Sequence, residues 1–196
     1  MPQKGHLGAM LVEAFVRRAV ARRPDSMPVV ACFCAVRDLP YALDGAHDAG
    51  GLLVQGRGDC VAKSELLMLA ARELGTAARY VCWLYLLPDV VPEVAELPSR
   101  LDVHRAVQVR TGGSWVLADA THHPGLRRTG LRVNDWDGRL DTQPGYPPVG
   151  PVIVEDAEQD AAVQARQQVQ LWTARCPPQV LATWRSAYIA WLRQRE

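Results

Sequence analysis

Apolar residues recur at helical spacing in a stretch that begins at Cys60 and ends before Gly75. The residues that share one face are Cys60, Ser64, Leu67, Ala71 and Leu74, and Leu66 and Ala70 widen it. Asp59 precedes the stretch and is a preferred N-cap residue, and glycine commonly follows a last helical turn. The pattern therefore predicts a buried helix that carries Cys60 in its first turn and follows the glycine-rich segment 56–58.

The same period predicts two helices earlier in the chain. The first covers residues 7–23 and ends at Pro24, and the second covers residues 28–39 and ends before Pro40. Residues 41–57 are rich in Gly and Asp and predict a loop with His47 exposed.

Alternating β-branched and aromatic residues predict strands after the Cys60 helix. The first strand covers residues 77–87, and a hairpin follows with strands at 103–110 and 114–119 around a glycine turn. Residues 119–151 contain little regular structure, apart from short strands near 131–133 and 152–154.

The pairing of that hairpin predicts a contact between His104 and Asp119. If Val109 pairs with Ser114, or Arg110 with Gly113, His104 falls directly opposite Asp119. Directly opposed side chains share a sheet face, with Cβ atoms about 4.5–5.5 Å apart. The carboxylate would then hold the imidazole ring, and the alternative is a surface His–Asp pair.

Two helices close the chain, at residues 156–174 and 178–193, on either side of Cys176-Pro177. Their aromatic side chains predict a core or subunit contact; they are Trp172, Trp184, Tyr188 and Trp191.

Composition narrows the class of protein. The 196 residues suit a single domain, and the formal charge of +1 favours neither nucleic acid nor an anionic membrane as partner. No apolar run reaches membrane-spanning length and no secretory signal is visible. The five cysteines predict reduced thiols in a cytoplasmic protein rather than a disulfide framework.

A thiol at a helix N-terminus has chemical consequences. Unpaired amides and the positive end of the helix dipole favour a thiolate at Cys60, and the same amides can bind an oxyanion. The alternative is that Cys60 merely packs in the core. Together, Cys60, His104 and Asp119 have the chemistry of a nucleophile, a base and the group that orients the base.

Other cysteines and histidines give no metal site. Cys32 and Cys34 are spaced too tightly for a usual zinc pair and are predicted core residues. His122 and His123 are adjacent and point in different directions, so the sequence predicts neither a metal nor another cofactor.

Several motifs resemble those of a known family. Gly58-Asp59-Cys60 opens a Leu- and Ala-rich helix that closes with Arg72-Glu73-Leu74-Gly75, and Ala78-Arg79 follows. His104 is followed by a strand, a glycine turn, Trp115 and Asp119-Ala120-Thr121. With the leading segment 36–41, these residues resemble the transglutaminase-like superfamily, a branch of the papain-like fold, over about residues 29–121.

The resemblance implies the fold and the activity. It implies an α+β papain-like/transglutaminase-like core, in which the nucleophile-bearing helix packs on an antiparallel β-sheet, with extra N- and C-terminal helices. The single domain would span residues 1–196, with its core at about 29–121 and a C-terminal helical extension at about 155–196. Gln55, five residues before Cys60, would be an oxyanion donor as in papain-like enzymes, or else a solvated loop residue.

The implied activity is acyl transfer through a thioester on Cys60, with His104 and Asp119 completing a catalytic triad. The donor would be an amide or thioester on a small molecule, a peptide or a carrier, and the acceptor an amine or water. A peptidase or amidase that only hydrolyses, and a non-catalytic binding module that retains the fold, are the alternatives. The sequence leaves the oligomeric state open.

Overall fold

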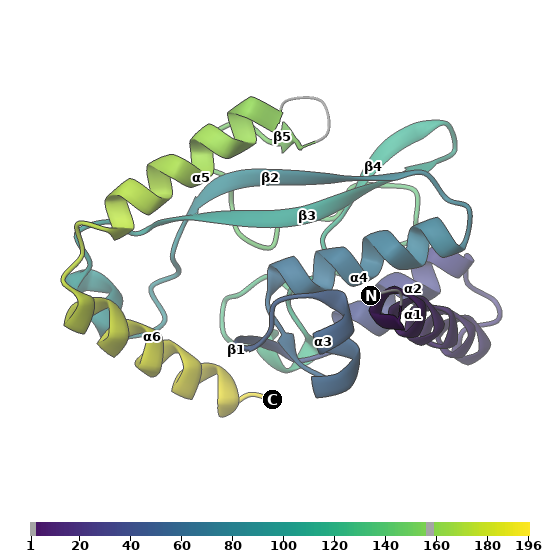
Figure 1. Ribbon diagram of the computed structural model, residues 1–196, viewed down its shortest axis with the longest axis horizontal. Coiled ribbons are helices and arrows are strands. Elements are labelled where there is room, and N and C mark those ends of the chain that lie inside the picture. The colour runs from purple at the N-terminus through teal and green to yellow at the C-terminus, as the bar shows by residue number, and fades with distance from the viewer. Residues whose placement is uncertain (1–2, 156–158) are drawn as a thin grey trace.

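The computed structural model describes residues 3–155 and 159–196, which form an α+β fold (Figure 1). The helices are α1 (Gln3–Arg22), α2 (Pro28–Arg37), α3 (Ala49–Gln55), α4 (Cys60–Glu73), α5 (Gln159–Thr173) and α6 (Pro178–Arg193). The strands are β1 (Tyr41–Ala46), β2 (Ala78–Leu86), β3 (Leu101–Thr111), β4 (Ser114–Ala118) and β5 (Ile153–Val154). Two 3-10 turns are η1 (Pro92–Glu96) and η2 (Pro124–Leu126).

Four strands form one antiparallel sheet in the order β4-β3-β2-β5. Helix α4 packs on β2 and β3, and α5 also contacts these two strands. In the view of Figure 1, α4 lies below the sheet and α5 above it. The predicted fold class, with the Cys60 helix on an antiparallel sheet, is confirmed.

Two hydrophobic clusters use opposite faces of the sheet. Val107 and Val109 join the first cluster, which contains the buried side chains of α1, α2 and most of α4. Ala106 joins the second cluster, together with side chains of β2, the segment after β4, and α6. Because side chains alternate along a strand, His104 lies on the same face as Ala106. Cys60 packs against the second cluster, so α4 connects the two.

The hairpin register differs from the prediction by two residues. Thr111 pairs with Ser114, so the loop consists of Gly112 and Gly113, whose φ angles are 56° and 86°. Two left-handed residues in a two-residue loop match the twist of the flanking strands, which explains this choice of turn. A shift of two residues keeps every side chain on its predicted face. His104 and Asp119 are therefore diagonal rather than directly opposed, on one face.

The prediction of a loop at residues 41–57 is wrong. This segment contains β1, which makes only isolated parallel bridges to Gly58, and the short helix α3. The Asp48 side chain caps the start of α3, and Gly56 ends it in the left-handed conformation. The capping signals were present, but the seven-residue helix is too short for a clear apolar period. The predicted exposure of His47 is confirmed.

Smaller expectations have mixed outcomes. Residues 153–154 form β5, whereas residues 131–133 form no strand. Cys32 and Cys34 are buried, as predicted. Trp184 and Tyr188 are buried in the second cluster, but residues 156–158 and the Trp172 side chain lie outside the described part of the chain. No helix within the described ranges has both the length and the apolar character needed to cross a bilayer.

Candidate active site

Cys60 is the first residue of α4, at the point where the chain leaves β1 and α3. The Asp59 side chain accepts a hydrogen bond from the Ala62 amide at 3.0 Å, and the Asp59 carbonyl accepts from the Lys63 amide. The helix-start amides of Cys60 and Val61 are then the ones without an intrahelical acceptor. These two amides can stabilise an oxyanion formed beside the Cys60 sulfur.

Glycines set the path of the backbone into Cys60. A Cβ on Gly58 would lie 2.8 Å from the Ala46 carbonyl oxygen, and one on Gly45 would lie 2.7 Å from the Arg57 carbonyl oxygen. Both contacts are with backbone, which cannot move aside. The glycine-rich sequence thus allows two segments to cross closely enough to fix the start of α4.

His104 is held in β3 inside a group of aromatic rings. Its side chain is fully buried, and it pairs across the sheet with Trp83. The ring centroids of Trp83, Tyr146 and Tyr85 lie 4.7, 5.1 and 6.0 Å from that of His104. Tyr146 also stacks on Tyr85 at 4.2 Å. This packing leaves the imidazole ring a single orientation.

Asp119 fixes one edge of the imidazole. His104 Nε2 lies 2.9 Å from Asp119 Oδ2, and the Gly145 amide donates to the same oxygen at 2.6 Å. The Thr121 amide donates to Oδ1 at 3.1 Å. Asp119 is only 1% exposed, so these donors, rather than water, hold its carboxylate.

Burial and pairing together set the charges of the two residues. Burial by itself would lower the pKa of His104, but the charge and hydrogen bond of Asp119, with a smaller contribution from Cys60, raise this pKa to about 10. Burial would raise the pKa of Asp119, but the charge and hydrogen bond of His104 outweigh burial and hold that pKa well below its usual range. Each residue thus favours the charged form of the other, an imidazolium beside a carboxylate.

The other edge of the imidazole faces the thiol. His104 Nδ1 is buried and makes no hydrogen bond of normal geometry within the described part of the chain. Cys60 contributes to the raised pKa of His104 and is half-buried against the same cluster. The structure therefore brings together all three residues singled out in the sequence: Cys60, His104 and Asp119.

A cavity of about 620 Å³ opens beside Cys60, and we call it the Cys60 cleft. One wall comes from β2 and β3 and the other from α5 and α6. Its apolar lining residues include Leu43, Val61, Leu87, Leu97, Leu101, Val103, Val169, Leu181 and Trp184. The C-terminal helices thus form part of the cleft beside Cys60.

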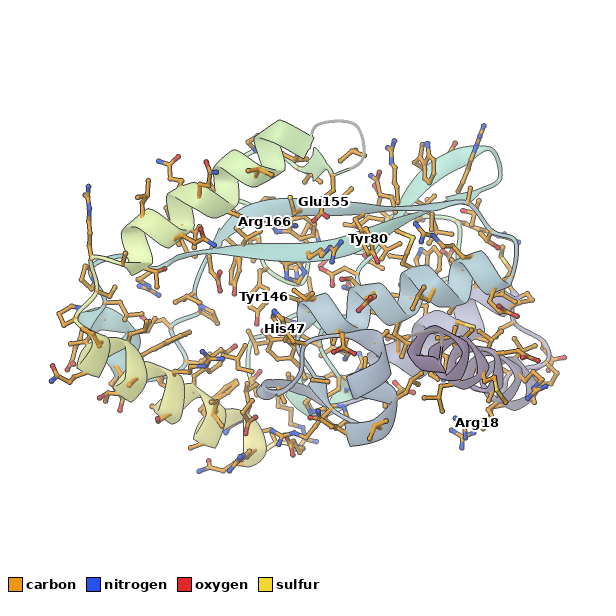
Figure 2. All side chains as sticks on the ribbon, viewed as in Figure 1. Arg18, His47, Tyr80, Tyr146, Glu155 and Arg166 are labelled. Atoms are coloured by element: carbon orange, nitrogen blue, oxygen red, sulfur yellow. The ribbon has the colours of Figure 1, made fainter. Side chains whose placement is uncertain are left out.

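The cleft also contains charged groups. Asp102 lies two residues before His104, and burial raises the pKa of its carboxyl group. Arg105 and Arg166 line the cleft, and both pair with Glu155, at 3.0 and 2.6 Å. Figure 2 labels Glu155 and Arg166 where α5 approaches the sheet. Glu155 thereby attaches α5 to β3 and neutralises part of the arginine charge.

Lys63, one turn after Cys60, was missed by the sequence analysis. Its ammonium group is buried and donates to the carbonyl oxygens of Arg37, Leu39 and Thr121 at 3.1, 2.7 and 2.6 Å. Burial lowers the pKa of Lys63 to about 7, against the opposing charge of Asp119. A signal was available, because Lys63 falls on the helical stripe of Leu66, Leu67 and Ala70. Lys63 thus connects the segment after Asp119 to α4.

We expect Lys63→Met to lower the free energy of unfolding by about 2–4 kcal/mol. Three buried carbonyl oxygens lose their donor at about 1–3 kcal/mol each, and relief from burying an ammonium offsets part of this cost. Urea denaturation measures the change. Arg18→Met on α1, an exposed position labelled in Figure 2, is the control and should shift stability by about 0.5 kcal/mol or less. If Lys63→Met has the same free energy of unfolding as the wild type, Lys63 makes no net contribution to stability and the prediction is wrong.

The segment after β4 supports Asp119 from behind. The Asn134 side chain donates to the Asp119 carbonyl at 3.0 Å, and the Asp119 amide donates to Thr142 Oγ1 at 2.9 Å. A Cβ on Gly145 would lie 3.0 Å from Asp119 Oδ2. These supports were also missed, because isolated polar residues and backbone amides in an irregular segment carry no periodic signal.

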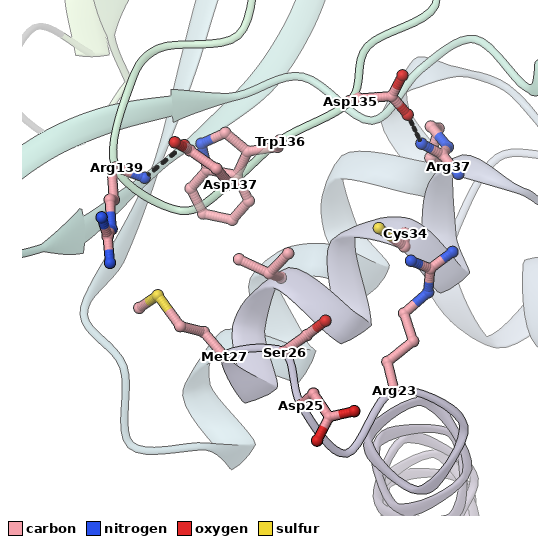
Figure 3. A pocket seen from close by; sticks show the side chains of 11 residues that line it. Arg23, Asp25, Ser26, Met27, Cys34, Arg37, Asp135, Trp136, Asp137 and Arg139 are labelled. Atoms are coloured by element: carbon pink, nitrogen blue, oxygen red, sulfur yellow. Dashed lines mark hydrogen bonds and ion pairs between the residues drawn. The ribbon is translucent and has the colours of Figure 1, made fainter.

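A second cavity, of about 510 Å³, lies between α2 and residues 135–139 (Figure 3). Arg37, at its edge, pairs with Asp135 and donates to the Asn134 carbonyl oxygen at 3.2 Å. The cavity is lined by none of the three residues of the proposed triad. Arg37 thus contacts the segment whose Asn134 side chain donates to the Asp119 carbonyl oxygen.

The adjacent histidines have separate structural contacts. His122 Nδ1 donates to the Arg132 carbonyl oxygen at 2.8 Å. His123 Nδ1 accepts from the Tyr41 amide, and its Nε2 donates to the Arg195 carbonyl oxygen, both at 3.0 Å. Burial lowers the pKa of both rings. Within the described ranges, no group of three or more His, Cys, Asp or Glu side chains is arranged to hold a metal ion.

Gln55 does not lie at the site. It is exposed at the end of α3 and is absent from the lining of the Cys60 cleft. The expected oxyanion role of Gln55 is therefore not supported, and the amides of Cys60 and Val61 are better placed.

Comparison with known proteins gives a family match for part of the chain. Residues 28–120 match the family model of the transglutaminase-like superfamily. A candidate cysteine protease from Cytophaga hutchinsonii is 19% identical with a TM-score of 0.42, and a TGase is 16% identical with a TM-score of 0.47. The two matches cover 56% and 63% of this chain, respectively. They cover only 37% and 34% of the length of the matched proteins. The comparison with curated proteins gave no significant match.

Proposed function

We propose that the protein transfers acyl groups through a thioester on Cys60, because residues 28–120 match the family model of the transglutaminase-like superfamily, which suggests a cysteine hydrolase or acyltransferase. The observation that carries this proposal is the position of Cys60. Its thiol lies at a helix N-terminus, beside the free edge of the buried His104 ring and at the wall of a cleft. A nucleophile, a proton donor and a binding space thus meet at one point.

The first half-reaction follows from the charges. The Cys60 thiolate, paired with the His104 imidazolium, attacks the carbonyl carbon of an amide or thioester. The amides of Cys60 and Val61 stabilise the oxyanion. His104 then gives its proton to the leaving amine or thiol, and the C–S bond of the acyl-enzyme remains. Asp119 keeps the imidazole oriented throughout.

In the second half-reaction an amine or water takes the acyl group. The acceptor attacks the thioester carbon, neutral His104 takes a proton from the acceptor, and the C–S bond breaks, which restores the ion pair between the sulfur and His104. An amine acceptor makes the protein an amide-forming acyltransferase, and water alone makes it a peptidase or amidase. The apolar lining of the Cys60 cleft suits the acyl part of a small molecule, a peptide or a carrier-bound substrate.

The pH dependence of alkylation by iodoacetamide tests the proposal. We expect Cys60 to react fastest of the five cysteines and to stay reactive well below pH about 8.5, where an ordinary thiol is protonated. His104→Ala should abolish this reactivity, because the thiolate loses its imidazolium partner. Peptide mass spectrometry reads each cysteine separately, so the buried Cys32, Cys34 and Cys82 serve as internal references.

The opposite result is equally informative. If Cys60 titrates as an ordinary thiol in the wild type and in His104→Ala, the ion pair does not exist. The protein would then be a binding module that retains the fold without turnover.

A further inference from the structure

A second histidine–carboxylate pair lies beside Cys60. His47 Nδ1 contacts Asp59 Oδ2, and Asp59 is the residue immediately before Cys60. Both His47 and Asp59 line the Cys60 cleft. Figure 2 shows His47 near the N-terminal end of α4.

The two pairs differ in their access to solvent. The side chains of His104 and Asp119 are both fully buried, whereas the His47 side chain is 77% exposed and its Asp59 partner only 12%. Asp59 is also fixed by its capping bond to the Ala62 amide. His47 is therefore oriented by a rigid carboxylate, while its Nε2 remains available to a molecule in the cleft and to water.

Transfer of an acyl group to an amine needs two proton acceptors. An alkylamine is an ammonium ion at neutral pH, and it must lose one proton before it can attack and a second when the amide forms. Attack by water requires the loss of only one proton. His104 can accept one of the two protons. Because its side chain is fully buried, it has no direct contact with solvent through which to release another.

We propose that His47, oriented by Asp59, takes the first proton from an amine acceptor at the mouth of the Cys60 cleft. This inference rests on the function proposed above. His47 Nε2 removes one proton from R–NH3+, and the neutral amine attacks the Cys60 thioester carbon. The C–S bond breaks, neutral His104 takes a second proton from the nitrogen and so restores its pair with the thiolate, the third proton stays in the amide, and His47 releases its proton to water. Atoms and charge balance without a further reactant.

The charges around the cleft suit a cationic acceptor. Asp59 and Asp102 both line the cleft, and Asp102 makes no ion pair within the described ranges. The nearby cations Arg105 and Arg166 share the single carboxylate of Glu155, and a third cation that lines the cleft, Arg185, donates to the Leu43 carbonyl oxygen at 3.4 Å. An arriving ammonium can thus meet the carboxylates of Asp59 and Asp102, while Glu155 offsets part of the arginine charge beside them.

Two acceptors separate this role from a structural one. p-Nitrophenyl acetate serves as the acyl donor at pH 7, and its nitrophenolate burst measures acylation of Cys60. Propylamine, an ammonium at this pH, and hydroxylamine, which is uncharged, are the acceptors. Mass spectrometry quantifies the two amide products. We expect His47→Gln to slow transfer to propylamine about 10²-fold, and the burst and transfer to hydroxylamine by less than about threefold.

Variants and pH refine the test. Asp59→Asn retains an N-cap residue but removes the anionic partner of His47, so it should reproduce part of the defect. Asp48→Ser removes a neighbouring carboxylate while retaining a capping residue for α3, and should leave transfer unchanged. The His47→Gln defect should shrink as the pH approaches the ammonium pKa of about 10.4, where the acceptor arrives neutral.

Each contrary outcome has its own meaning. Absence of any Cys60-dependent burst in the wild type overturns the proposed function, and the inference with it. A normal burst with equal transfer in His47→Gln and the wild type overturns the inference alone. If His47→Gln reduces the burst and the transfer to both acceptors by the same factor, His47 only positions Cys60. That result also overturns the inference.

Discussion

Cys60→Ala should abolish the acyl-enzyme and reduce turnover by at least about 10⁴-fold, the scale of loss when a catalytic nucleophile is removed. Water cannot replace the thiolate, because the helix-start amides and the His104 imidazolium are arranged around the sulfur. The side chain is small and half-buried, so the free energy of unfolding should fall by only about 1 kcal/mol. Nitrophenolate release from p-nitrophenyl acetate and intact-protein mass spectrometry measure the two effects.

Cys82→Ala is the matched control for this variant. Cys82 is fully buried on β2 and does not line the Cys60 cleft. Its replacement leaves a similar small void but should leave acylation unchanged. If Cys60→Ala retains wild-type acylation, or if both cysteine variants lose it equally, Cys60 is not the nucleophile.

Asp119→Ala should lower the free energy of unfolding by about 3–5 kcal/mol, the cost of leaving one member of a buried ion pair unpaired. The His104 imidazolium, the Thr121 amide and the Gly145 amide would all lose their acceptor in a site that excludes water. Asp119→Asn should cost less stability but still misorient the imidazole and slow turnover. Urea denaturation and acylation rates measure these effects, and Glu13→Gln on the surface of α1 is the control.

The sign of the pH dependence follows from the two pKa shifts. Folding raises the pKa of His104, so its stabilisation is complete below the unfolded value of about 6.5 and is lost as pH rises toward about 10. Folding lowers the pKa of Asp119, so its stabilisation is present above about 3.9 and is lost as pH falls. The stability difference between the wild type and Asp119→Asn should therefore be largest between about pH 4 and 6.5. A difference that grows toward pH 9 would contradict the ion pair.

The nucleophile helix was the most predictable part of the fold. The stripe that starts at Cys60, the Asp59 cap and Gly75 all act locally, so sequence neighbours carry the whole signal. The hairpin was predictable as an element, but its register was not. Several turns could be built around Gly112 and Gly113, and only the twist of the assembled sheet selects the turn with both residues in the loop.

The supports of the site could not be predicted, because they act over long distances. Gly145 contributes a backbone amide to Asp119 across 26 positions, and Lys63 reaches the Thr121 carbonyl across 58. Neither contact leaves a local pattern of apolar and polar residues from which the distant partner could be identified. The pairing of His47 with Asp59 was hidden for another reason, since the short α3 that follows His47 was read as loop.

The separation of the two hydrophobic clusters has a consequence for how this protein can evolve. The body of α4 is anchored in the first cluster, whereas the cleft wall residues Leu97, Leu181 and Trp184 belong to the second. Substitutions at distant, independent positions change stability almost additively. New side chains in the cleft wall can therefore alter which acyl group fits while the anchoring of the thiol-bearing helix stays intact. Diversification of substrate preference can proceed on one side of the sheet without first destabilising the other.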